Sequence, residues 1–469
     1  MIKELTKLTA ADAVAKLLPV ITLPIVARAL GPETYGRVGF AAATAGFFAV
    51  AASPGFIPWG IREAAKNPGR EVAIASSVMT GRALFSVAAF ALLAVYTITL
   101  APADPQVRAL LVLFGTGFLV SSLSLEWLLT ATQRFSVVAI LSVVSQLVYA
   151  AAIVAFVRTP RDAWVLPAAA ALASAISAAL AWGVLRRHVR GVRPAFGESG
   201  WRAIAPGAMT LGLASLMSLT FDKVDMVLLG YLRDPAEVGN YAAAYKLMGL
   251  AMSFLPIMSQ VFMPAVAAEL GAGGKSHDKA RAYLRLFWFA ALPAVAGSLL
   301  VAGPFSRLVL GAGYAAAPLL FAVLLPNVVC GGLASYYAGL RLMVAGRNRH
   351  YLQAVASGAA VNVIGNVALI PVIGALAAAI TTCLSQATVA AVGAWLSRDM
   401  PGPALLTGAA PALIAGTAMV ASLLAAAHLA PQLHVVGVIA LGAGVYAACY
   451  FALLKLRPAP IAAAITDRS

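Results

Sequence analysis

The sequence predicts an all-α integral membrane protein with about 14 transmembrane helices and no soluble domain of appreciable size. Hydrophobic residues make up 62% of the 469 positions, and charged residues make up only 11%. A soluble domain needs about 25% charged residues to cover its surface. Apolar stretches of about 20 residues, the length that crosses a bilayer as a helix, recur along the whole chain. Lipid, rather than water, is therefore the main solvent of this protein.

The apolar stretches define fourteen candidate helices in order, separated mostly by short polar connections. They lie near residues 9–30, 38–60, 76–101, 107–130, 136–157, 164–185, 204–231, 238–266, 284–302, 317–342, 351–373, 376–396, 404–427 and 435–455. Several helices contain proline, and a broken helix is tolerated in a membrane where a cavity or a neighbouring helix satisfies the backbone. The prolines expected to interrupt helices in this way are Pro19, Pro24, Pro54, Pro58, Pro256, Pro264, Pro326 and Pro371.

The basic residues of the connections fall mostly on one side of the membrane. Of the 33 Lys and Arg residues, 21 lie on the side of the N-terminus and six lie on the opposite side. Cytoplasmic connections carry such an excess of Lys and Arg. We therefore expect a multi-pass protein of a cytoplasmic membrane with both termini in the cytoplasm. The basic side chains that give the net charge of +16 then face anionic lipid headgroups. We therefore expect no nucleic-acid partner.

Two pairs of similar segments predict an internal repeat of six helices. Residues 30–43 resemble residues 232–244, and residues 129–135 resemble residues 342–347. Both pairs are six helices apart, so the two halves would have the same orientation, which is one of the repeat plans of secondary transporters.

The repeat divides the chain into four predicted parts. These are an N-terminal six-helix bundle over residues 1–190, a basic cytoplasmic linker over 191–203, a second six-helix bundle over 204–398, and two additional C-terminal helices with a tail over 399–469.

No sequence pattern typical of an enzyme is present. The HExxH, CxxC, GxSxG and Walker patterns do not occur, and the five histidines lie in connections or at helix ends without ligand spacing. The predicted outer connections are too short to hold the catalytic carboxylates of a membrane glycosyltransferase. We therefore expect no enzyme, no metal site and no cofactor, and leave open whether transport is coupled to H⁺ or Na⁺.

Ten ionisable residues lie inside the predicted helices. An ionisable side chain at the bilayer centre costs about 2.5–3.5 kcal/mol, so each one needs a structural or functional reason. Six are basic and four are acidic, and they are Asp12, Lys16, Arg28, Arg82, Glu126, Asp222, Lys223, Asp225, Lys246 and Arg341.

Purely structural explanations are available for several of these charges. Arg28, Arg82 and Arg341 lie near helix ends, from which their side chains can extend to the membrane interface. Asp12 and Lys16 are spaced i, i+4 and can pair with each other.

The deepest predicted charges lie on the seventh and eighth helices. At 1.5 Å per residue, Asp225 and Asp222 lie about 10 and 15 Å below the outer end of one helix, and Lys246 lies about 12 Å down the next. A structural ion pair and a substrate contact are both open for these residues. The two roles are compatible, because a pair that lines a wet cavity can open to bind an anionic ligand.

Several segments resemble a known transporter family. Residues 17–36 read LLPVITLPIVARALGPETYG and resemble the opening of the polysaccharide-transporter, or O-antigen flippase, family, which shares a superfamily with MATE drug exporters and lipid II flippases. The remaining matches are found at residues 126–128, 133–135, 222–225, 238–241 and 245–247, at Asn362 and Asn366, and at residues 370–371 and 374–375.

This resemblance implies a fold, a substrate and a location. The fold would be the MATE-like V shape of two bundles with alternating access. The substrate would be an undecaprenyl-diphosphate-linked oligosaccharide, flipped from the cytoplasmic to the periplasmic leaflet of a bacterial inner membrane during cell-surface polysaccharide biosynthesis. A monomer is expected, with membrane lipids, a polysaccharide polymerase and other biosynthesis proteins as further partners.

The intramembrane charges fit this implied substrate, because a basic-leaning interior suits an anionic diphosphate-sugar headgroup. We assign substrate binding to Arg28, Arg82, Lys223, Lys246 and Arg341. We assign coupling or charge tuning to Asp12, Lys16, Glu126, Asp222 and Asp225. Two alternatives stay open, namely a MATE-like cation-coupled antiporter for drugs or other small molecules, and a structural membrane protein that has lost transport.

Overall fold

The computed structural model describes residues 2–186, 190–196, 200–271, 277–429, 432 and 434–456, with side chains from residue 21 onward except at 203, 210, 214, 270, 271 and 456. Helices form the regular structure of this part of the chain, and no strand occurs within it. The all-α prediction is therefore confirmed. The chain divides into two compact units, Met1–Ala242 and Ala243–Ser469, which are described separately.

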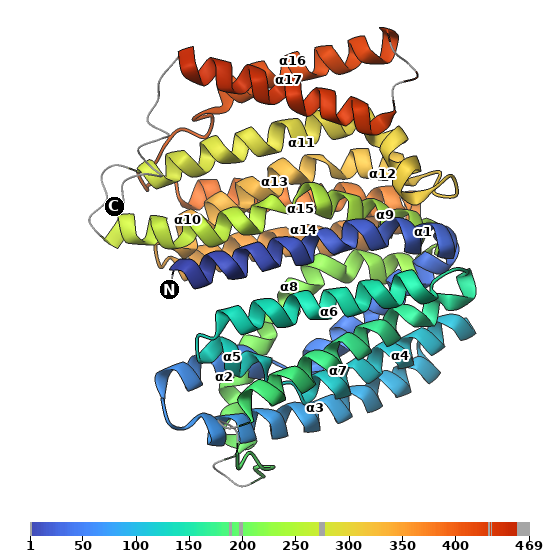
Figure 1. Cartoon of the computed structure of the whole chain (residues 1–469), viewed down its shortest axis with the longest axis vertical. Coiled ribbons are helices and arrows are strands. Elements are labelled where there is room, and N and C mark those ends of the chain that lie inside the picture. The colour runs from blue at the N-terminus through green and yellow to red at the C-terminus, as the bar shows by residue number, and fades with distance from the viewer. Residues whose placement is uncertain are drawn as a thin grey trace. The chain divides into compact units, whose positions relative to one another are not determined.

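The first unit is built from helices that pack side by side (Figure 1). They are α1 (Ile2–Ala52), α2 (Phe56–Lys66), α3 (Glu71–Thr99), α4 (Pro105–Ser122), α5 (Glu126–Ala131), α6 (Phe135–Phe156), η1 (Pro160–Trp164), α7 (Val165–Leu185), α8 (Trp201–Leu232) and the first half of α9 (Pro235–Ala251). Helix α1 contacts α3, α4, α6 and α8, so it is the central helix of this unit.

The second unit continues from α9. Its helices are α10 (Phe254–Gly271), α11 (Asp278–Leu310), α12 (Ala317–Leu324), α13 (Pro326–Ala334), η2 (Ser335–Met343), α14 (Asn348–Ile373), α15 (Ala375–Leu396), α16 (Ala409–Leu429) and α17 (Val435–Leu456). The predicted additional pair, α16 and α17, packs on α11 at one edge of the unit (Figure 1).

Twelve described helices are long and apolar enough to cross a membrane, and the bent pair α9 and α10 gives a thirteenth. The expected number of about 14 is close to this range. Helix α1 contains the expected span near 9–30 and the first part of the one near 38–60, which ends in α2. Helix α1 is continuous except for a kink at Gly31, where φ is 67° and ψ is 170°. Pro32 follows directly, and its fixed φ suits the first position of a helix.

Other spans are broken helices. Residues 53–55 separate α1 from α2 at Pro54, and Pro326 begins α13 one residue after the end of α12, so these two prolines interrupt helices as expected. The other six prolines do not break their helices: Pro19 and Pro24 lie within α1, Pro58 within α2, Pro256 and Pro264 within α10, and Pro371 within α14. Helices α9 and α10 meet at an angle of 42°. The α4–α5 break at residues 123–125 contains no proline.

Each unit has its own apolar core. In the first unit Phe56, fully buried, packs with Trp127 and Leu128 where α2, α3 and α5 meet. In the second unit Tyr283 and Phe287 lie in a core between α11 and the α13–η2 segment. Both cores lie within helix bundles, so close packing rather than water exclusion alone holds them together in lipid.

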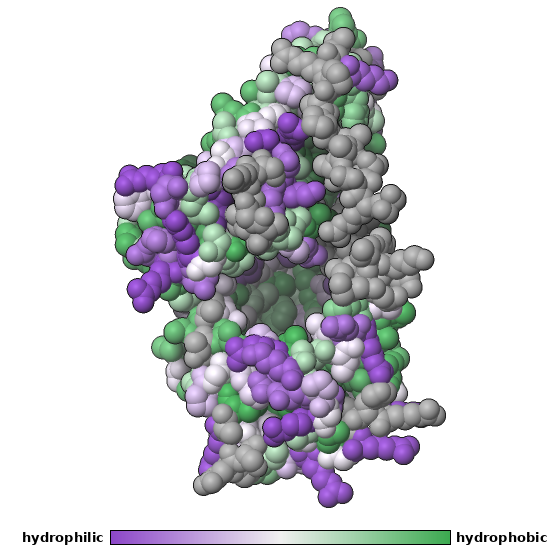
Figure 2. Space-filling view, turned by 90° about the vertical axis from the view of Figure 1, so that its left-hand side faces the viewer, coloured by the Kyte–Doolittle hydropathy of each residue, from purple (hydrophilic) through white to green (hydrophobic). Residues whose placement is uncertain are grey.

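Hydrophilic side chains are seen at the end of the first unit where α2 and α5 lie. Figure 2 shows them on the face that corresponds to the left-hand side of Figure 1, where α2 and α5 lie. In the first unit Arg62, Lys66 and Arg70 are exposed at the connection between α2 and α3. These residues belong to the set that the charge distribution assigns to the cytoplasm.

Candidate functional site

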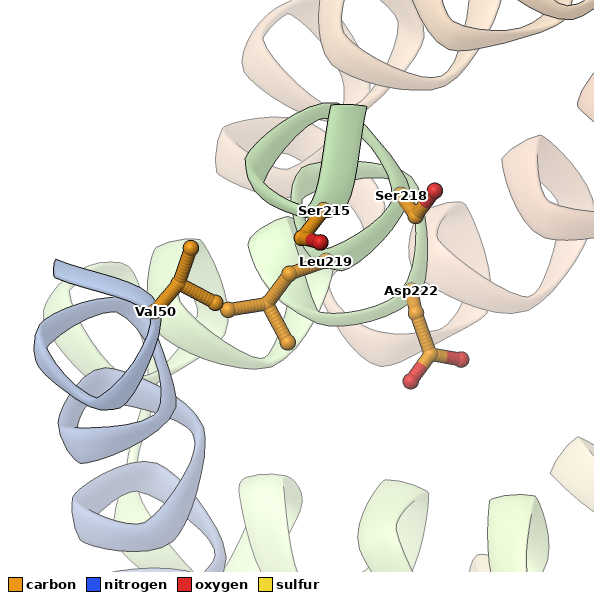
Figure 3. A pocket seen from close by; sticks show the side chains of 5 residues that line it. All are labelled: Val50, Ser215, Ser218, Leu219 and Asp222. Atoms are coloured by element: carbon orange, nitrogen blue, oxygen red, sulfur yellow. The ribbon is translucent and has the colours of Figure 1, made fainter. Parts of the chain in front are cut away.

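An open cavity of about 560 Å³ lies against the middle of α8 in the first unit. Its lining side chains are Ser215, Ser218, Leu219 and Asp222 from α8 and Val50 from α1 (Figure 3). The four α8 positions follow the i, i+3, i+4, i+7 spacing that places side chains on one face of a helix. Ser218 and Asp222 lie on the same side of α8, and Leu219 reaches toward Val50 (Figure 3).

The opposite face of the same helix is apolar and also exposed. Leu213 is 60% exposed and Met217 is 38% exposed. At 100° per residue, these two positions lie roughly opposite Ser215 and Ser218 on the helix. A spanning helix with an apolar exposed face and a polar exposed face fits lipid on one side and a water-filled space on the other, because polar groups in a membrane normally face the bundle interior or an aqueous cavity.

The charge at the cavity belongs to an ion pair. Lys223 Nζ lies 2.9 Å from a carboxylate oxygen of Asp222, and the two side chains are 33% and 49% exposed. A pair this exposed to water contributes little to stability. It can therefore separate at small cost if a ligand offers a better partner.

One turn further along α8, Asp225 is buried and accepts two hydrogen bonds. The hydroxyl of Tyr241 on α9 donates to one carboxylate oxygen, and the backbone N–H of Met226 donates to the other at 2.6 Å. Asp225 is 2% exposed and Tyr241 is fully buried. Asp225 therefore links α8 to α9 and does not face the cavity.

Arg82, predicted to bind substrate, lies at the break between α4 and α5. Its guanidinium donates to the backbone carbonyl of Ser124 at 2.9 Å and to that of Ser121, and the residue is 3% exposed. Positive charge near the C-terminal end of α4 is favourable, because its carbonyls have no partner within the helix. Glu126, just after the break, accepts a hydrogen bond from the hydroxyl of Ser177 on α7.

Arg341 has a comparable environment in the second unit. It lies on η2, a π-helical segment, and donates to the backbone carbonyls of Ser397, at 3.0 Å, and Met400 just after α15. Arg82 and Arg341 are thus both bound by carbonyl oxygens at helix ends. Their predicted role in binding substrate stays a prediction.

The remaining predicted residues are placed as follows. Arg28 on α1 and Lys246 on α9 are exposed, in the first and second unit respectively. The side chains of Asp12 and Lys16 lie outside the described residues. Of the ten predicted residues, Asp222 lines the cavity and Lys223 is its ion-pair partner. The pairing of Lys246 with Asp222 and Asp225 stays a prediction.

Another charged group lies outside the spans, where Asp104 caps α4. It accepts from the backbone N–H groups of Gln106, at 2.8 Å, and Val107, and from Arg37 Nε at 2.6 Å. Burial opposes the charge on Asp104, but Arg37 and the two N–H groups outweigh it and hold the pKa of Asp104 below its ordinary value. Arg37 also pairs with Glu33 at 2.8 Å.

Sequence reasoning missed three residues of this region, Ser215, Ser218 and Tyr241. The two serines could have been found from their spacing with Asp222 on a helical face. Tyr241 could not, because its hydrogen bond depends on how α8 and α9 cross. Within the described residues, no group of three or more His, Cys, Asp or Glu side chains is placed to hold a metal ion.

The fold is that of known membrane transporters. A structure described as the lipid II flippase MurJ in an inward closed conformation aligns with 96% of this chain and 99% of its own, with a TM-score of 0.78 and 13% identity. An inward-facing multidrug resistance MATE family transporter of the MOP superfamily aligns with 84% of this chain and 97% of its own, with a TM-score of 0.64 and 14% identity. At these identities the likeness shows the fold alone.

Sequence comparison gives a further relative, the "Putative O-antigen transporter" of Escherichia coli (strain K12). It is 24% identical over 267 residues, which cover 54% of this chain and 62% of that protein. The chain thus spans less than two thirds of that relative's length. These relatives are described as transporters and flippases, and none of the three is described as an enzyme. Residues 1–268, more than half of the chain, match the model of the polysaccharide biosynthesis protein family, and the chain belongs to that family.

Proposed function

We propose that this transporter flips an undecaprenyl-diphosphate-linked oligosaccharide from the cytoplasmic to the periplasmic leaflet of a bacterial inner membrane. The observation that carries the proposal is the α8 cavity, because its polar face lies in the middle of a spanning helix. A sugar headgroup needs hydroxyl and charged partners within the membrane, and Ser215, Ser218 and Asp222 with its partner Lys223 provide them. The family and the O-antigen relative support a polysaccharide precursor as the substrate class.

The ion pair at the cavity provides a way to bind the diphosphate. Lys223 exchanges Asp222 for a phosphate oxygen, and the exposed cations Arg28 and Lys246 offer further contacts. Arg82 fixes the break between α4 and α5 within the first unit, and Arg341 fixes the end of α15 within the second unit, since both are bound to backbone carbonyls. Charge-assisted hydrogen bonds to phosphate are about twice as strong as neutral ones, so the exchange is favourable.

The acidic residues tune and couple this cycle. Asp222 returns to Lys223 when the substrate leaves, and Asp225 transmits the state of α8 to α9 through Tyr241. Asp12, Lys16 and Glu126 complete the set of intramembrane charges that respond to H⁺ or Na⁺. The basic connections face the cytoplasm in this cycle. The two predicted six-helix halves, residues 1–190 and 204–398, rock against each other. A polymerase takes up the flipped oligosaccharide on the outer side.

The test removes the cations and measures export. The double variant Lys223→Ala/Lys246→Ala is expected to abolish surface polysaccharide export in cells lacking the native transporter, while membrane insertion is retained. A matched double variant, Lys66→Ala/Lys279→Ala, removes two lysines from connections and should export normally. Unchanged export in the Lys223/Lys246 variant would remove the central role given to these two residues.

A second function is favoured by one observation, namely that the charged residue lining the cavity is the carboxylate of Asp222. A carboxylate suits a cationic drug, and a MATE family transporter shares the fold. Deletion of the gene separates the two functions. Loss of envelope polysaccharide with unchanged drug susceptibility supports the flippase, and increased drug susceptibility with normal polysaccharide supports the antiporter.

A further inference from the structure

The predicted additional pair, α16 and α17, shares the apolar core of the second unit with α11. The three helices lie side by side (Figure 1), and their buried side chains belong to one cluster that also includes the α13–η2 segment. Ala412, Ala415 and Met419 are buried positions of α16 within this cluster. Because small residues let helices approach closely in a membrane, the pair is an integral part of this unit.

Helix α11 has a gap in its backbone hydrogen bonds at Pro293. Proline has no N–H group, so residue 293 cannot donate to the carbonyl of Phe289, four positions earlier. At 1.5 Å per residue, Phe289 lies about 16 Å from the start of α11. A carbonyl at such a depth has no water to bind, and leaving it without a donor costs free energy. The carbonyl of Phe289 therefore needs a donor from another part of the protein.

Tyr446 of α17 is this donor. Its hydroxyl donates to the backbone carbonyl of Phe289 at 2.9 Å, and Tyr446 is 3% exposed. The rings of the two residues also contact each other, with centroids 5.6 Å apart. The hydroxyl thus replaces the hydrogen bond that Pro293 removes from α11.

Aromatic packing fixes Tyr446 in this position. The ring centroid of Phe289 lies 4.6 Å from that of Tyr450 and 6.2 Å from that of Phe451. The rings of Tyr446 and Tyr450 stack, with centroids 6.0 Å apart. These contacts hold α17 against the turn of α11 that precedes the proline.

The C-terminal segment also contacts α11 on both sides of Pro293. Four residues after the proline, a Cβ atom at Gly297 would lie 3.5 Å from the ε-methyl group of Met419 on α16. Before the proline, Trp288 Nε1 donates to the carbonyl of Leu405, in the connection between α15 and α16, at 2.9 Å. Helix α11 is therefore supported before, at and after its missing hydrogen bond.

We propose that α16 and α17 act as a splint for α11, and that Tyr446 is a positioning residue that holds α11 in one conformation at Pro293. The other face of α11 packs on the α13–η2 segment, where the hydroxyl of Tyr283 donates to the carbonyl of Gly332 at 3.3 Å. The splint thus fixes α11 relative to η2, which carries Arg341. This role goes beyond the proposed function, because it does not depend on the substrate.

The first experiment is a double-mutant cycle between Tyr446→Phe and Pro293→Ala. Tyr446→Phe keeps the ring and removes the donor. The ratio of folded to unfolded protein in mixed micelles should then fall roughly three- to tenfold, the range for hydrogen bonds between membrane helices. Alanine at position 293 restores a backbone N–H for the carbonyl of Phe289. In the Pro293→Ala background, Tyr446→Phe should therefore change the ratio by less than about twofold.

Tyr450→Phe is the matched control. Tyr450 lies one turn further along α17, is 5% exposed and packs on the same Phe289 ring, but its hydroxyl makes no hydrogen bond to a described residue. The folded-to-unfolded ratio of this variant should equal that of the wild type.

The second experiment tests whether the effect is local to α11. Hydrogen–deuterium exchange measured by mass spectrometry should be about threefold faster or more at residues 290–297 in Tyr446→Phe, because the turn around Pro293 opens more often. Exchange in α14 and α15 should stay at the rate of the wild type. A general loss of stability would speed exchange in those helices as well.

Three results would each overturn the splint. They are an equal fall of the ratio in both backgrounds, a fall no larger than that of Tyr450→Phe, and exchange that rises equally in α11, α14 and α15. If Pro293→Ala does not insert, the exchange of Tyr446→Phe compared with that of Tyr450→Phe still decides. Neither measurement uses a substrate, so a failure of the proposed flippase function would leave both results unchanged.

Discussion

The hydrogen bond between Tyr241 and Asp225 gives a prediction with a defined magnitude. The change Tyr241→Phe removes one hydroxyl and keeps the ring, so the tightly packed site, in which Tyr241 is fully buried, gains no large cavity. The carboxylate of Asp225, 2% exposed, then loses one of its two described donors and has little access to water in exchange. A hydrogen bond to a charged group contributes about 1.5–3 kcal/mol, so we expect the free energy of unfolding to fall by that amount.

A matched variant tests whether the charge is the cause. Tyr283 is also fully buried, but its hydroxyl donates to the neutral backbone carbonyl of Gly332 at 3.3 Å. Tyr283→Phe should therefore cost only about 0.5–1.5 kcal/mol. In the background of Asp225→Asn, the effect of Tyr241→Phe should shrink to that of a neutral bond.

The assay is equilibrium unfolding in mixed micelles with increasing denaturing detergent, followed by the loss of helical circular dichroism. The coupling between Asp225 and Tyr241 is read from the double-mutant cycle. Two results together would contradict this account: Tyr241→Phe lowers the free energy of unfolding by no more than Tyr283→Phe, and the decrease is the same in the Asp225→Asn background. Asp225 would then not accept the bond as a charged group, and its role in linking α8 to α9 would be wrong.

Three further predictions concern other polar contacts. Arg82→Lys should destabilise the protein, because a lysine ammonium lacks the planar guanidinium that reaches the carbonyls of both Ser121 and Ser124. A midpoint of thermal unfolding equal to that of the wild type would contradict this prediction. Asn366→Leu should lower the free energy of unfolding by about 1–3 kcal/mol, measured as for Tyr241, because the buried Oδ1 of Asn362 loses the hydrogen bond that the Asn366 amide donates at 3.2 Å. The pKa of Asp104 is lowered in the folded state, so its stabilising effect is present above its ordinary value of 3.8 and is lost as the pH falls through the lowered pKa. Asp104→Asn should remove this acid-side loss, and an unchanged stability profile below pH 4 would count against the pairing with Arg37.

The sequence was sufficient to predict where most helices lie, because an apolar stretch of membrane length has no alternative to a helix in lipid. It also predicted the breaks at Pro54 and Pro326, since proline removes a backbone donor, but the six other prolines expected to interrupt helices lie inside them. It did not predict the α4–α5 break, where no proline occurs. There Arg82, about 40 residues away in sequence, donates to the carbonyls of Ser121 and Ser124.

The candidate site was predicted in part, for a similar reason. A charge inside a spanning helix is visible in sequence, and this led to Asp222 and Lys223. The burial of a charge is not visible, because it depends on the neighbouring helix. Asp225, only three residues from Asp222, turns toward Tyr241 and away from the cavity. Serines such as Ser215 and Ser218 are common in membrane helices and gain meaning only once the cavity beside them is known.

The central claim is that the polar face of α8 lines a water-filled chamber within the membrane. The most direct measurement is the rate at which a charged, water-soluble thiol reagent labels single cysteines placed along α8, in a variant whose native cysteines Cys330, Cys383 and Cys449 are changed to Ala. We predict fast labelling of Ser215→Cys, Ser218→Cys and Asp222→Cys, and slow labelling of Leu213→Cys and Met217→Cys on the opposite face. Equal rates on both faces, or no labelling at the three cavity positions, would contradict the account.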